Sequence, residues 1–168
     1  MTRALIRSIA FRAEGAALAL LAAFALGCGE RRDRTAADAG TILTARTLGL
    51  AYLEENRLED AETEFAKLVR LAPGEPSGHA NLGLVYLRLG QYQDAARAIQ
   101  RAVALAAEDL DIRLLQATAF RLTGRPEEAR RTLEAVLGTA PSHLKTLYAL
   151  AEVAAEIGGP DASARRQQ

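Results

Sequence analysis

The side chains that could do chemistry are few and scattered in this chain of 168 residues. Cys28 is its single cysteine, and His79 and His143 are its two histidines. Neither histidine has a partnering Cys or a neighbour at metal-ligand spacing, and no phosphate loop, serine nucleophile elbow or pair of histidines on one helix is present. We therefore predict no catalytic residue, no metal site, no cofactor and no enzymatic activity, and we expect structural or surface roles for both histidines.

The charge of the chain is balanced, with 21 basic and 21 acidic residues. A dedicated nucleic-acid-binding protein normally carries a marked basic excess, so no nucleic-acid partner is expected. Acidic residues gather most densely at 54–64, where they fall on several sides of two expected helices. A solvated surface is the expected role of this acidic cluster, and a patch for a protein partner is the alternative.

Cys28 lies at the end of a segment typical of an export signal. Three arginines precede an uncharged stretch, residues 15–27, that is rich in Ala, Leu and Phe. This stretch is shorter than the roughly 20 apolar residues needed to cross a bilayer. We predict that residues 1–27 are a signal peptide, and that their removal leaves a slightly acidic mature chain.

The end of that segment, Gly27-Cys28, resembles the lipobox of bacterial lipoproteins, in which a small residue precedes the Cys that becomes lipidated. The resemblance implies lipidation at Cys28, a membrane partner reached through this lipid anchor, and a place in the bacterial cell envelope facing the periplasm, with the outer membrane favoured. Two other interpretations stay open: Cys28 is incidental beside an ordinary cleavage site, or the segment remains uncleaved as an anchor. Residues 28–41 begin with Cys28 and continue as small and polar residues, which predicts a flexible linker.

A period of 34 residues organises the rest of the chain, as in the column Asn56, Gly90, Gly124 and Gly158. In each unit, apolar residues at helical spacing precede this Gly or Asn, which favours the left-handed conformation at a helix end. Acidic residues then mark the first turn of a second helix, where the helix dipole favours negative charge. Small residues recur in both helices, so each unit is expected to be a closely packed antiparallel pair.

This pattern resembles the tetratricopeptide repeat family, whose unit is a 34-residue helix–turn–helix. The resemblance implies an all-α solenoid of antiparallel helix pairs, with three full repeats plus a C-terminal capping helix. The expected bounds are 42–75, 76–109 and 110–143 for the full repeats, 144–157 for the partial one, and 158–168 for a tail. Gln116 stands where the family has Leu, which predicts a locally looser third unit. A truncated fourth repeat is the alternative to a true cap.

In this family the first helix of each unit lines a concave surface where partners bind. Transferred by position, the resemblance implies a protein or peptide partner held in a groove of these residues: Leu43, Arg46, Leu50, Leu53, Asn81, Leu84, Leu87, Arg88, Leu114, Thr118, Arg121 and Tyr148. Asn81 matches the clamp with which some members bind an acidic carboxyl-terminal tail, but Leu50, Asp111 and Leu115 do not. An apolar helix or extended peptide therefore fits better, and packing between units is the alternative role of some leucines.

Three functions are compatible with these features. The first is a non-enzymatic, membrane-anchored protein–protein interaction scaffold, because lipoproteins of this architecture assist the assembly of envelope machines such as the type IV pilus. The second is an accessory subunit of a protein or polysaccharide export system that binds the exported substrate. The third is a homo-oligomer formed through the helix at 144–157. The fold alone does not choose among them.

Overall fold

The computed structural model describes residues 38–158. Cys28, the predicted signal peptide, most of the predicted linker and all but the first residue of the predicted tail lie outside this range. The described residues form helices joined by short turns and contain no strand. The prediction of an all-α fold is confirmed.

A helix over residues 38–54 comes first in the described chain. It is followed by α2 (Leu58–Leu71), α3 (Pro76–Arg88), α4 (Tyr92–Leu105), α5 (Leu110–Leu122), α6 (Pro126–Thr139) and α7 (Leu144–Gly158). Residues 38–41, which their polar character assigned to the flexible linker, are instead the first turn of the first helix. The composition of a short polar segment does not prevent helix formation when an apolar helix continues it.

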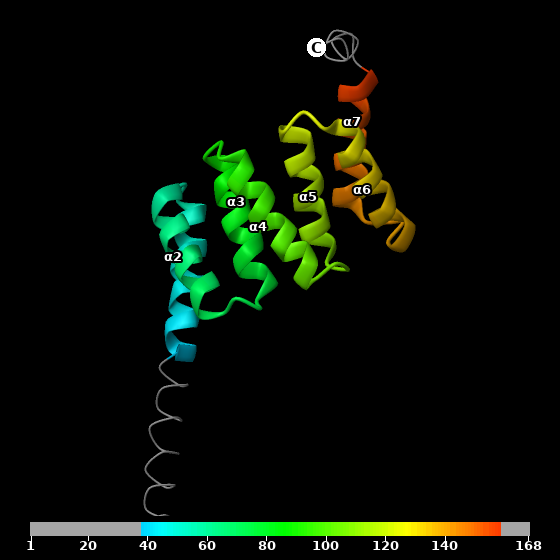
Figure 1. Cartoon of the computed structure of the whole chain (residues 1–168). Coiled ribbons are helices and arrows are strands. Elements are labelled where there is room, and N and C mark those ends of the chain that lie inside the picture. The colour runs from blue at the N-terminus through cyan, green and yellow to red at the C-terminus, as the bar shows by residue number, and fades with distance from the viewer. Residues whose placement is uncertain (1–37, 159–168) are drawn as a thin grey trace, which may run out of the picture. The chain divides into compact units, whose positions relative to one another are not determined.

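Contacts place a boundary in the chain between Leu43 and Thr44. Residues 44–158 are called the helical array. Within it, each helix packs against the helices before and after it in the chain (Figure 1). The helix α5 also contacts α3 on one side and α7 on the other, which places these three helices along one face of the array. This shared face is called the inner face.

The turns inside the pairs have the backbone conformation that their residues predict. Asn56 has a φ of 56°, and Gly90 and Gly124 each have a φ of 74°. An L-residue with a side chain is disfavoured in this region, which Gly and Asn adopt most readily. These residues end the first helix of each pair and let the chain reverse into the second.

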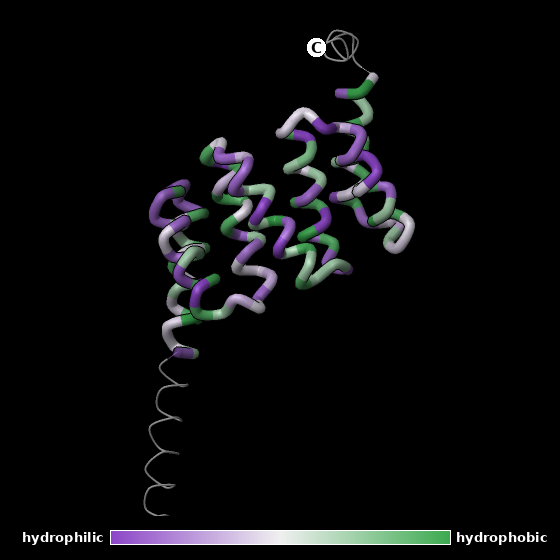
Figure 2. Tube along the Cα trace, viewed as in Figure 1, coloured by the Kyte–Doolittle hydropathy of each residue, from purple (hydrophilic) through white to green (hydrophobic). Residues whose placement is uncertain are grey.

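Each pair is held together by large side chains that lie over small residues. A Cβ atom added at Gly83 would lie 2.5 Å from Cγ1 of Ile99, and one added at Gly49 would lie 2.8 Å from Cε1 of Phe65. Phe65, Ile99 and Leu133, which are 34 residues apart, are among the largest fully buried side chains in the described chain. Figure 2 shows the hydropathy of each residue along the chain, and hydrophobic residues alternate with hydrophilic ones in most helices.

Candidate functional site

A groove of about 470 Å³ lies between α3 and α5 on the inner face. Apolar side chains dominate its walls, with a few polar groups among them. It is lined by Pro76, Ser77, Ala80, Asn81, Leu84, Asp109, Asp111, Ile112, Leu114, Leu115 and Thr118. This set is called the α3–α5 groove, and it brings together four residues that the sequence predicted for partner binding: Asn81, Leu84, Leu114 and Thr118.

Helical periodicity explains how each wall of the groove is built. On α3, Ser77, Ala80 or Asn81, and Leu84 follow one another at spacings of three to four residues, so they share one side of the helix. The α5 wall begins at Asp109, whose carboxylate accepts hydrogen bonds from the backbone N–H groups of Asp111 (3.0 Å) and Ile112 (3.1 Å). This N-cap fixes where α5 starts and therefore where its apolar wall lies.

One end of the groove is bordered by charges that already have partners. Glu75 accepts a hydrogen bond from Arg46 Nη2 at 2.6 Å and another from Ser77 Oγ at 2.5 Å. Burial by itself would raise the pKa of Glu75, but the hydrogen bonds from Ser77 and Arg46 and the positive charge of Arg46 outweigh burial and lower that pKa below its ordinary value. Glu75 therefore remains an anion at neutral pH and holds Arg46 beside the groove.

Contacts between residues 34 or 35 positions apart connect successive repeats. Lys145 Nζ lies 3.1 Å from Asp111 Oδ1, and Arg121 Nη1 lies 2.8 Å from Glu156 Oε1. Arg88 Nη1 donates to the carbonyl oxygen of Leu53 at 3.2 Å. These cross-repeat contacts were not predicted, although opposite charges at a spacing of one repeat are a signal that the sequence contains. Three arginines were predicted to contact a bound protein at the edge of the groove, and each contacts another residue of this chain. These are Arg46, Arg88 and Arg121.

Two of the predicted groove residues are buried and do not line the α3–α5 groove. Leu53 is 8% exposed and Leu87 is 6% exposed, and Leu87 packs in a core cluster with Ala95, Ile99 and Ala119. Contact of either leucine with a partner stays a prediction. Leu43, Leu50 and Tyr148 are exposed but do not line the α3–α5 groove.

Comparison with known protein families identifies the repeat. A model described as tetratricopeptide repeat matches residues 80–143 and 114–166, and a second model of the same description matches residues 47–75. The first of these models alone spans more than half of the chain. The chain belongs to the tetratricopeptide repeat family. No curated protein sequence matches this chain at a significant level.

Solved tetratricopeptide repeat domains have the same fold at low sequence identity. The first such domain of human RPAP3 superposes with a TM-score of 0.67 at 20% identity, covering 76% of this chain and 97% of the domain. The first such domain of Spaghetti, bound to the HSP90 peptide SRMEEVD, gives 0.65 at 21% identity, covering 71% and 94%. The Yersinia enterocolitica type III secretion chaperone SycD, bound to a peptide of the translocator YopD, gives 0.62 at 16% identity, covering 69% and 94%.

The two histidines of this tetratricopeptide repeat protein bond to nearby turn or helix residues. His79 is buried, and its Nε2 lies 3.0 Å from the carbonyl oxygen of Pro73, in the turn before α3. Nδ1 of His143 lies 2.7 Å from Oγ1 of the buried Thr146 at the start of α7. Neither histidine lines the α3–α5 groove. Among residues 38–158, no group of three or more His, Cys, Asp or Glu side chains is placed to hold a metal ion.

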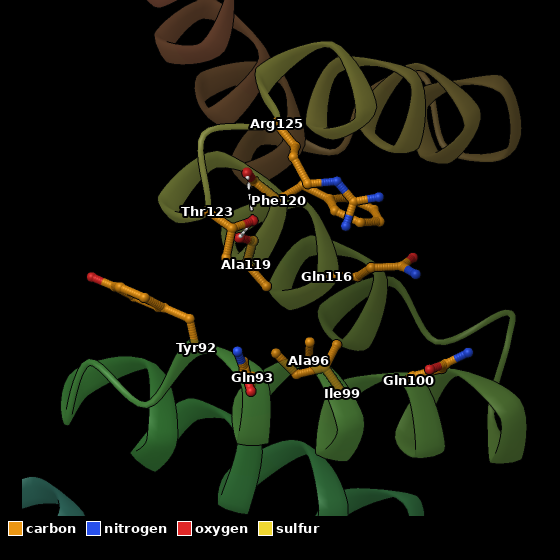
Figure 3. Close-up of a pocket in the computed structure, with 10 residues that line it drawn as sticks. All are labelled: Tyr92, Gln93, Ala96, Ile99, Gln100, Gln116, Ala119, Phe120, Thr123 and Arg125. Carbon is orange, nitrogen blue, oxygen red and sulfur yellow. Dashed lines mark hydrogen bonds between the residues drawn. The ribbon is translucent and has the colours of Figure 1, made fainter. Parts of the chain in front are cut away.

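A second hollow, of about 430 Å³, lies between α4 and α5 and is called the α4–α5 pocket. Figure 3 shows Ala96 and Ile99 of α4 facing Ala119 and Gln116 of α5 across it. At its rim, the guanidinium of Arg125 lies over the ring of Phe120, 4.6 Å from the ring centroid. Gln116 thus lies at a gap in the packing, where the sequence predicted a looser third unit.

No helix within residues 38–158 is both long enough and apolar enough to cross a bilayer.

Proposed function

We propose that this chain is a non-enzymatic protein-interaction scaffold of the bacterial cell envelope, anchored to a membrane through Cys28. Its α3–α5 groove binds an apolar segment of a partner protein, either a helix or an extended peptide. The observation that carries the proposal is the groove itself, an open hollow of about 470 Å³ whose walls come from the partner-binding helices of two successive repeats.

The lining of the groove indicates the chemistry of the segment it would take. Leu84, Leu114 and Leu115 offer apolar contacts, and the Asn81 amide can both donate and accept hydrogen bonds with a peptide backbone. Asp109 and Asp111 lie at the same groove and would repel an acidic tail. The bound peptides of the Spaghetti and SycD structures support peptide binding by this fold. In this chain, the acidic residues favour a segment without a negatively charged end.

The partner is proposed to belong to an envelope machine such as the type IV pilus, whose assembly the chain would assist. A second candidate is an exported protein that binds in the same groove. The structure of SycD, a secretion chaperone bound to a translocator peptide, supports this second candidate.

The groove is tested by photo-crosslinking in cells that express the full-length chain at its natural level. A photoreactive amino acid is placed at Leu84 or at Thr118, both in the groove, and at Ala104, an exposed position on α4, as the matched control. We expect adducts with the same protein from both groove positions and none from Ala104. Equal adducts at all three positions, or none from the groove, would refute groove binding.

The anchor is tested separately by feeding cells an alkyne fatty acid. We expect label on the native chain, and both loss of label and release from the membrane fraction for Cys28→Ser. Persistent labelling of Cys28→Ser would refute lipidation at this residue without bearing on the groove.

A further inference from the structure

The last described helix presents an uncovered apolar face. Leu144, Leu147 and Tyr148 of α7 are 79%, 42% and 70% exposed. Ala151, Ala154 and Ala155 are exposed as well, and they continue the same side of the helix. These six residues are called the α7 face. Only Thr146 and Val153 of α7 are buried.

The α7 face contains the interface that every full repeat buries. Residues equivalent to Ala151 are Gly49, Gly83 and Ala117, and all three are buried in the array. The equivalents of Leu147 in the first two repeats, Ala45 and His79, are buried too. In each full repeat of the described chain a second helix follows and packs against the first over the positions equivalent to Ala151, whereas no described helix follows α7.

An antiparallel helix with apolar side chains would therefore fit this surface. Residues 159–168 read GPDASARRQQ and hold no Leu, Ile, Val, Met or aromatic residue, so they lack the side chains for the task. A second α7 has them, and its two halves are complementary in size. Its amino-terminal half carries the large residues Leu144, Leu147 and Tyr148, and its carboxy-terminal half carries alanines.

We propose that the α7 face is a self-association surface, on which two copies of this chain pack α7 against α7 antiparallel about a two-fold axis near Ala151. In this arrangement Leu147 of one copy lies over Ala154 of the other, and Tyr148 lies over Ala155. Large side chains thus meet small ones along the whole contact, and the two alanines at 151 allow the helices to approach closely. A parallel arrangement would place Leu on Leu and Ala on Ala, which leaves gaps.

Charge does not oppose this contact. The charged residues of α7 are Lys145, Glu152 and Glu156, which lie beside the α7 face and not on it. Lys145 and Glu156 are also paired within the chain, with Asp111 and Arg121. Closing the face between two copies therefore buries no unpaired charge, and a two-fold contact closes on itself without forming a filament.

The proposal is tested with the full-length chain in detergent, using cysteine substitutions in a Cys28→Ser background and a mild oxidant. Ala151→Cys lies near the two-fold axis and is expected to form a disulfide-linked dimer. Ala104→Cys, at an exposed position on α4, is the control and is expected to form no such dimer. A mixture of Leu147→Cys and Ala154→Cys chains is expected to form more cross-linked dimer than either chain alone, because only the antiparallel arrangement places these residues together.

Sedimentation measures the association without cross-linking. The native chain is expected to be a dimer that dissociates on dilution, and Ala151→Arg, an exposed substitution, is expected to be a monomer with an unchanged helical circular dichroism spectrum. A native chain that stays monomeric at every concentration would overturn the proposal. So would a dimer that survives Ala151→Arg, because its contact would then lie elsewhere.

Discussion

The α2–α3 junction and the α4–α5 junction occupy the same place in successive repeats, yet only one of them is tightly packed. Phe65, Leu82 and Val85 fill the first, where Phe65 and Val85 are fully buried. Their equivalents 34 residues later are Ile99, Gln116 and Ala119, which line a pocket of about 430 Å³. Each replacement is smaller or more polar, so the gap is the summed effect of three changes. A solenoid tolerates one loosely packed junction because each repeat contacts only the repeats next to it, so the loss of packing stays local.

The α6–α7 junction shows that loose packing is not a general trend toward the carboxyl end. The residues at its equivalent positions are Leu133, Leu150 and Val153, all apolar, and Leu133 and Val153 are buried. Because α5 lines both the α4–α5 pocket and the α3–α5 groove, the weak junction lies directly behind one wall of the groove. Fewer apolar contacts lower the cost of local movement, so this wall is expected to adapt more readily to a bound segment.

The largest effect is expected from opening the tight junction with Phe65→Ala. The side chain is fully buried, and its removal leaves a cavity over Gly49, which should cost about 3–5 kcal/mol of unfolding free energy. Urea unfolding followed by circular dichroism measures the loss. Leu71→Ala, a partly exposed position on the same helix, is the control and should change stability by about 0.5 kcal/mol or less. Similar losses for both variants would contradict the packing of Phe65 over Gly49.

Leu82→Gln places at the tight α2–α3 junction the residue type that Gln116 provides at the loose α4–α5 junction. The change removes a buried leucine and buries an amide, so a loss of about 2–4 kcal/mol is expected. Calorimetric melting provides the measurement. A loss below about 1 kcal/mol would mean that Gln116 alone does not explain the difference between the junctions.

The reverse experiment is Gln116→Leu combined with Ala119→Val, which should fill the α4–α5 pocket. Burying additional apolar surface in an existing hollow is expected to stabilise the chain by about 1–2 kcal/mol. Denaturant midpoints report the gain, and hydrogen exchange of the α5 amides should slow. The matched control is Gln100→Leu at an exposed position on the same pocket. A destabilised double variant would show that the pocket cannot accept these side chains without strain.

The smallest effect concerns Glu75, where the first repeat meets the second. Its pKa is lowered in the folded state, so its contribution is fully present above the ordinary value of 4.5 and is lost as the pH falls through the folded pKa. Glu75→Gln should cost about 0.2–1 kcal/mol at neutral pH and flatten the stability profile below pH 4.5. Unfolding at a series of pH values tests this against Glu108→Gln, an exposed control. Identical pH profiles for the native chain and Glu75→Gln would exclude the interaction.

The local features of the fold were largely predictable, and side-chain direction within a helix was not. Asn56, Gly90 and Gly124 end helices as their types indicate. Leu84 and Leu87 were assigned to one groove, yet Leu84 lines it and Leu87 packs in the core. They lie three residues apart on a helix that has apolar residues on more than one side, so periodicity alone cannot separate a groove leucine from a core leucine.

Residue types at a fixed spacing of 34 were enough to predict the repeat, the pairing of its helices and a looser third unit at Gln116. The intramolecular partners of Arg46, Arg88 and Arg121 and the exposed face of α7 became known from the folded chain alone. These properties depend on which groups of other helices come within contact distance, and helical periodicity within one segment carries no information about that.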